Sequence, residues 1–121
     1  MQRYELEAWL GDNHGLTEDQ VTDLLGHANE IEARYPDPDD QNERDAALEV
    51  AYRFTGGDEG VANDVMQELA IARGAAQAAE NRALAGLRQA AIMQIPTTET
   101  ESSFARAANV DRMTVRKWLG K

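Results

Sequence analysis

Apolar residues recur along much of this chain at intervals of three and four, the spacing that places side chains on one face of an α-helix. The clearest case begins after Thr17 and Gln20, which have the spacing of an N-terminal capping box, and ends at Pro36. This pattern predicts an amphipathic helix whose buried face comprises Val21, Leu24, Leu25, Ala28, Ile31 and Tyr35.

Two further helices are predicted in the N-terminal half. The segment Arg3 to Gly11 fits a helix with Tyr4, Ala8 and Trp9 on one face, although alternate residues are also apolar, as in a strand. We favour a helix because no second strand is available to pair with it. Another helix is expected from Gln41 to Phe54, before a glycine pair. The expected core of this region comprises Trp9, Leu24, Leu25, Ile31, Leu48 and Phe54.

A helix is predicted from Glu59 to Ile95, and Asp58 can cap it. Along it runs a stripe of mostly small apolar residues: Val61, Val65, Leu69, Ala72, Ala76, Ala79, Ala83, Leu87 and Ala90. Gly74 and Gly86 each weaken such a helix by about 1 kcal/mol relative to alanine, so a break near Gly74 is allowed. Alanine buries little surface, and a helix of this kind usually needs a partner. We therefore expect it to join two copies of the chain in a homodimer.

The composition supports an all-α fold, because alanine is frequent and β-branched residues are few. The expected order is an acidic helical body, a long alanine-rich helix and a C-terminal group of three helices. There is no cysteine, no apolar run that could span a membrane, and no signal-peptide pattern at the N-terminus. We expect a cytoplasmic protein without a membrane partner.

Charge is distributed unevenly. The formal net charge is -10, yet residues 1–95 hold 19 acids and 7 bases, giving −12, whereas residues 96–121 hold 5 bases and 3 acids, giving +2. This asymmetry is typical of a basic nucleic-acid-binding segment attached to an acidic body.

The basic C-terminal segment has the pattern of two short helices joined by a tight turn. Thr98 and Glu101 form a second capping-box spacing, which predicts a helix reaching about Ala108. Ala105 is small enough to let another helix cross closely. Asn109 falls where such a turn needs a left-handed backbone, which asparagine tolerates better than other non-glycine residues.

The second of these helices is predicted over residues 111–119, with Asp111 as its N-cap and Val115, Trp118 and Leu119 buried. Its remaining side chains would face the major groove of DNA, where arginine can bond guanine, while neighbouring hydroxyls and lysines meet phosphates. The predicted DNA-binding residues are Ser102, Ser103, Arg106, Arg112, Met113, Thr114, Arg116, Lys117 and Lys121.

The run from Phe104 to Lys121 resembles the C-terminal end of small homeodomain-like helix-turn-helix proteins of high-GC bacteria, their phages and plasmids, with Asn109 in place of their glycine. The resemblance covers about the last third of the chain. It implies that the helix from Ala79 to Ile95 is the first of three, with Leu84, Leu87 and Ala91 inward. We therefore expect a DNA-binding domain over residues 76–121. The resemblance does not extend to residues 1–75, whose helical pattern and acidic charge instead indicate a separate body used for dimerisation or partner binding.

Catalysis and cofactors have no support in the sequence. His14 and His27 lack the spacing of a helical zinc site, and Asp37, Asp39 and Gln41 copy only the start of a calcium loop. The glycines near residue 57 follow no strand and precede no lysine, as a phosphate-binding loop requires. We expect neither an enzyme nor a cofactor or metal site.

Two functions are open. The first is a sequence-specific DNA-binding regulator of transcription or replication, a homodimer that reads the major groove of double-stranded DNA with helix 111–119. The second is an acidic interaction factor, such as an anti-repressor or polymerase-binding protein, whose C-terminal motif docks protein. In either case a second protein could bind the acidic N-terminal region.

Overall fold

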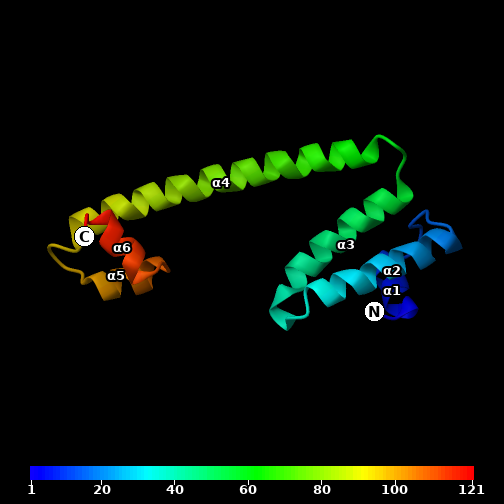
Figure 1. Cartoon of the computed structure of the whole chain (residues 1–121), viewed down its shortest axis with the longest axis horizontal. Helices are drawn as coiled ribbons and strands as arrows, with labels where there is room; N and C mark the ends of the chain where they lie inside the picture. The colour runs from blue at the N-terminus through cyan, green and yellow to red at the C-terminus, as the bar shows by residue number, and fades with distance from the viewer. The chain divides into compact units, whose positions relative to one another are not determined.

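The computed structural model describes residues 1–121 and contains only helices, which confirms the all-α prediction. The chain forms two compact units, Met1–Leu69 and Ala70–Lys121 (Figure 1). The helices are α1 (Arg3–Leu10), α2 (Glu18–Arg34), a 3₁₀ turn (Pro38–Asp40), α3 (Gln41–Gly56), α4 (Val61–Gln94), α5 (Glu101–Ala108) and α6 (Arg112–Trp118).

The N-terminal unit is built around the pairing of α2 with α3, and α1 packs against α2. The predicted capping box starts α2: the Thr17 hydroxyl accepts from the Gln20 N–H at 3.2 Å, and the Gln20 side chain accepts from the Thr17 N–H at 2.9 Å. The buried residues are Leu6, Val21, Leu24, Ala28, Ile31 and Leu48. The amphipathic pattern therefore predicted the inner face of α2 correctly.

The first segment is a helix as expected, but the predicted inner face was wrong. Leu6 is fully buried, whereas Tyr4 is 72% exposed and Trp9 is 39% exposed. This eight-residue helix carries apolar residues around most of its circumference, so packing against α2 selects the face. Trp9 instead meets Tyr52 edge to face at the surface, with ring centroids 6.2 Å apart.

Phe54 is a second correction to the expected core, because 45% of its surface is exposed. Leu48 is the buried residue of α3, and Ala47, Ala51 and Tyr52 pack partly against the same cluster. Phe54 belongs to the last turns of α3 and lies off this inner face, on the wall of a surface groove shared with α2.

The alanine-rich segment forms one uninterrupted helix, α4, which passes through Gly74. Helix propagation over 34 residues outweighs the cost of about 1 kcal/mol for a glycine. Val65 is fully buried near its start, and Arg53 of α3 forms an ion pair with Glu68. Every residue from Met66 to Ala83 is exposed, so the predicted stripe of Leu69, Ala72, Ala76, Ala79 and Ala83 has no covering partner within the chain.

Candidate nucleic-acid interface

The C-terminal unit is a three-helix cluster formed by the end of α4 with α5 and α6. Ala91, Phe104, Ala105 and Val115 are its buried residues, and Trp118 and Leu119 are among the side chains that pack around them. Leu84 and Leu87 are partly buried, in line with the inward positions expected from the resemblance. Ala105, only 5% exposed, is the small residue expected where helices lie close together.

Helix α5 begins later than the sequence pattern suggested. Thr100, not Thr98, is its N-cap: the Thr100 hydroxyl accepts from the Ser103 N–H, and the Ser103 hydroxyl accepts from the Thr100 N–H, both at 3.0 Å. The N–H groups of residues 97–99 all bond the Gln94 carbonyl, which prolongs the end of α4 as a turn. The chain is therefore free to start a new helix only at Thr100, and Glu101 becomes the first helical residue.

The tight turn between α5 and α6 has the predicted geometry. Asn109 adopts the left-handed conformation, with φ 55° and ψ 45°, and the Val110 N–H bonds the Ala105 carbonyl at 3.0 Å. Asp111 caps α6, since its carboxylate accepts from the Met113 N–H at 3.0 Å. The turn and cap together fix the direction in which α6 leaves α5.

Substitutions at Asn109 should show how much this turn depends on its left-handed residue. A β-branched residue is expected to lower the stability of the C-terminal unit by about 1–2 kcal/mol, because its Cβ clashes in this conformation. Asn109→Gly should be neutral or slightly stabilising. Urea unfolding followed by Trp118 fluorescence would measure both, and equal midpoints for Asn109→Val and Asn109→Gly would contradict the argument.

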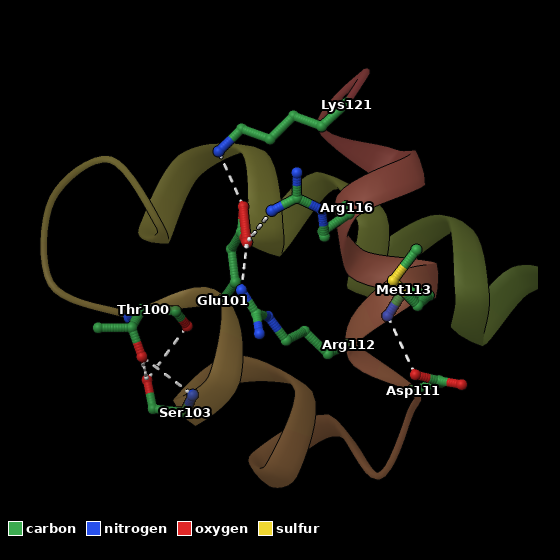
Figure 2. A network of polar contacts seen from close by, with 8 residues as sticks. All are labelled: Thr100, Glu101, Ser103, Asp111, Arg112, Met113, Arg116 and Lys121. Carbon is green, nitrogen blue, oxygen red and sulfur yellow. Dashed lines mark hydrogen bonds and ion pairs between the residues drawn. The ribbon is translucent and has the colours of Figure 1, made fainter.

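Three cations converge on one carboxylate at the start of α5. Glu101 Oε1 accepts from Lys121 Nζ at 2.8 Å, Oε2 accepts from Arg116 Nη1 at 3.1 Å, and Oε2 lies 3.8 Å from Arg112 Nη2. Figure 2 shows all three cationic side chains turned toward Glu101. We call these four residues the Glu101 cluster.

The Glu101 cluster is partly covered. The Glu101 side chain is only 13% exposed, whereas those of Arg112, Arg116 and Lys121 are 59%, 38% and 52% exposed. The hydrogen bond from Lys121 is the main cause that holds the pKa of Glu101 below its ordinary value; Arg116 acts in the same direction, and desolvation opposes both. The carboxylate is thus charged at neutral pH, and the cations lie between it and solvent.

The other predicted contact residues lie around this cluster but outside it. Met113 is 64% exposed, and Lys117, Arg106 and Ser102 are exposed as well. Met113 and Lys117 are four residues apart on α6, directly opposite its buried face. Thr114 is half-buried, and Ser103 is engaged in the cap of α5, where its hydroxyl also donates to Glu99 at 2.5 Å. Neither of these two hydroxyls is as open to an incoming ligand as that of Ser102.

The role of Glu101 on this surface differs from the role that the sequence pattern predicted. It was expected to complete a capping box with Thr98, yet it pairs with residues 11, 15 and 20 positions later in the chain. No local spacing relates an acid to cations so far along the sequence. The one signal in the sequence that could have drawn attention to Glu101 is that it is one of only three acids in residues 96–121.

Comparisons of the chain with protein-family models, with curated proteins and with solved structures found no match. No helix combines the length and the apolar character needed to cross a lipid bilayer. No three side chains of histidine, aspartate or glutamate are grouped as metal ligands would be.

Proposed function

We propose that this chain is a sequence-specific DNA-binding regulator of transcription or replication, which inserts α6 into the major groove. The observation that carries the proposal is the α5–α6 pair: two short helices joined by a left-handed turn at Asn109, with Arg112 and Lys117 of the second helix exposed and Arg116 half-buried. This is the docking arrangement of helix-turn-helix proteins, whose second helix reads base edges.

The charge of each unit supports the proposal. Ala70–Lys121 holds 8 bases and 4 acids, a formal charge of +4, whereas Met1–Leu69 holds 4 bases and 18 acids, a formal charge of −14. Phosphates attract the first unit and repel the second. DNA binding is therefore assigned to the C-terminal unit alone.

Side chains on α6 divide by chemistry into base-reading and phosphate-binding groups. Arg112 and Arg116 can each form two parallel hydrogen bonds to guanine, and Met113 can contact a thymine methyl group. Lys117 and Lys121 suit phosphates, as do the hydroxyls of Ser102 and Thr114. Arg106 on α5 adds a further exposed positive charge.

Arg112→Ala is expected to weaken binding to the preferred site by about 1–3 kcal/mol and to relax selectivity at one base pair. Lys117→Ala should instead weaken binding to all sequences alike. It should also reduce the slope of log binding constant against log salt concentration by about one. Selection of bound fragments from random DNA, followed by fluorescence anisotropy over a range of salt, measures both effects.

The matched control for Arg112 is Arg73→Ala, which removes the same charge from an exposed part of α4 outside the α5–α6 pair. It should leave the selected sequence unchanged. If Arg112→Ala and Arg73→Ala gave the same consensus and the same affinity, α6 would not be the reading helix.

We also propose that the protein acts as a homodimer joined through α4. Leu69, 49% exposed, continues into the stripe formed by Ala72, Ala76, Ala79 and Ala83, in which steps of three and four residues alternate. That period is typical of helices that pair along a narrow seam. A dimer would place two α6 helices on half-sites about one turn of DNA apart, or a multiple of it.

A protein-interaction role is the second candidate, and one feature of the N-terminal unit favours it. A groove of about 400 Å³ between α2 and α3 has an apolar lining that includes Ile31, Val50 and Phe54, within a unit of strongly negative charge. A basic amphipathic segment of another protein would suit it. Copurification of a stoichiometric partner, with no shift of genomic DNA fragments at low salt, would favour this role over DNA binding.

A further inference from the structure

We propose that Glu101 is a positioning residue that sets the selectivity of the α6 surface, by holding Arg116 through a hydrogen bond and Arg112 through an ion pair. This inference rests on the proposed DNA-binding function. It starts from an apparent conflict, because an acid at the centre of a basic surface should weaken contact with phosphates.

The burial of the cluster resolves this conflict. Glu101 is 13% exposed, and the cations that contact it are three to five times more exposed. DNA approaching this surface therefore meets guanidinium and ammonium groups first. The less exposed carboxylate of Glu101 can hold these cationic groups on their inner side while their outer side contacts DNA.

Enough hydrogen-bond donors remain for a ligand. Arg116 donates one N–H of its Nη1 group to Glu101, and Arg112 approaches Glu101 only as an ion pair at 3.8 Å. A guanidinium carries five N–H donors, so each arginine keeps the pair of donors needed for a guanine edge. Lys121 likewise donates one of its three N–H groups to Glu101 and keeps two for a ligand.

Fixing the arginines should favour bases over phosphates. A free arginine side chain has many rotamers and can follow any nearby phosphate, whereas a held one loses less entropy when it binds at a defined place. Base reading requires that defined place, and phosphate binding does not. An anchored arginine therefore discriminates between sequences better than a mobile one.

The carboxylate also lowers the charge of the surface. Arg112, Arg116 and Lys121 with Glu101 have a formal charge of three positive minus one negative, or +2. Nonspecific binding depends almost wholly on charge, while specific binding also uses base contacts. This electrostatic reduction applies to every duplex alike, so the effect of Glu101 on selectivity comes from holding the arginines in place.

Two substitutions separate the charge of Glu101 from its geometry. Glu101→Gln keeps the size of the side chain but removes the charge that holds the arginines. Unrelated duplexes should bind several-fold more tightly, whereas at the preferred site the lost positioning should offset the electrostatic gain. The ratio of the two dissociation constants should therefore fall by the same several-fold factor. Glu101→Asp keeps the charge and shortens the side chain by one methylene, so the ratio should fall while affinity for unrelated DNA stays unchanged.

Glu99→Gln is the matched control, since Glu99 lies two residues away, is exposed and bonds Ser103 rather than a cation. It makes the same charge change, so both dissociation constants should shift together and their ratio should stay within about twofold. The start of α5 is capped by Thr100 and Ser103, so substitution of Glu101 removes no capping hydrogen bond. Circular dichroism would check that each variant keeps its helices.

The measurement is the dissociation constant of each variant for the selected site and for an unrelated duplex of equal length, by anisotropy over a range of salt. If the wild-type chain selects a sequence but Glu101→Gln and Glu101→Asp keep its selectivity ratio, only the role of Glu101 is overturned. If the wild-type chain binds no DNA at low salt, the proposed function itself fails, and this inference with it.

Discussion

Replacing Val115 by aspartate is expected to abolish DNA binding and to unfold the C-terminal unit while the N-terminal core stays intact. Val115 is fully buried and packs with Phe104, Ala105 and Ala91 in a core that contains no buried polar or charged residue. An unpaired charge in such a place costs several kcal/mol. That cost is comparable with the whole stability of a small domain.

The N-terminal unit should survive because its buried cluster shares no residue with the cluster around Val115. Circular dichroism should report a partial loss of helix, and amide NMR signals of Leu6 and Leu24 should remain dispersed. Anisotropy should detect no DNA complex. Met113→Asp introduces the same acid at an exposed position of α6 and should keep the fold. A fully folded Val115→Asp variant would contradict the packing described here.

The second large effect is expected from Ala76→Glu, at the middle of the α4 stripe. If α4 joins two copies, this change places a glutamate from each copy at a close contact between helices, where both would lose solvent. The dimer should dissociate at micromolar concentration. Binding to a palindromic site should weaken about a hundredfold or more, because the second half-site no longer binds as part of the same molecule.

Gln77→Glu is the control for Ala76→Glu. Residue 77 is also exposed, and a step of one residue turns it about 100° around the helix, away from the stripe. Analytical ultracentrifugation should find a dimer for Gln77→Glu and a monomer for Ala76→Glu. A monomeric wild-type chain would overturn the homodimer, although not the DNA-binding role of α6.

Local patterns predicted the parts of this fold that local physics controls. The α2 capping box, the left-handed Asn109, the Asp111 cap and the inward Val115 each depend on residues within a few positions of one another. They were correct because a helix boundary or a tight turn satisfies its backbone hydrogen bonds locally.

The errors arose where more than one local pattern was possible, and a neighbouring turn or a tertiary contact chose between them. Thr98 and Thr100 can both begin a helix, and the Gln94 carbonyl decided between them by holding residues 97–99 in a turn. In α1 the contact with α2 chose Leu6 over Tyr4. The role of Glu101 depends on the packing of α5 against α6, which no spacing along the chain encodes.

The unequal division of charge between the two units has a consequence for how a regulator of this kind would find its site. One unit carries a formal charge of −14. If the chain binds DNA as proposed, this unit would shorten each encounter with unrelated DNA, so the protein would scan short stretches and return to free diffusion. Little of it would be sequestered by the bulk of the chromosome. A small number of copies could then keep an operator occupied, and occupancy would respond quickly to changes in their synthesis.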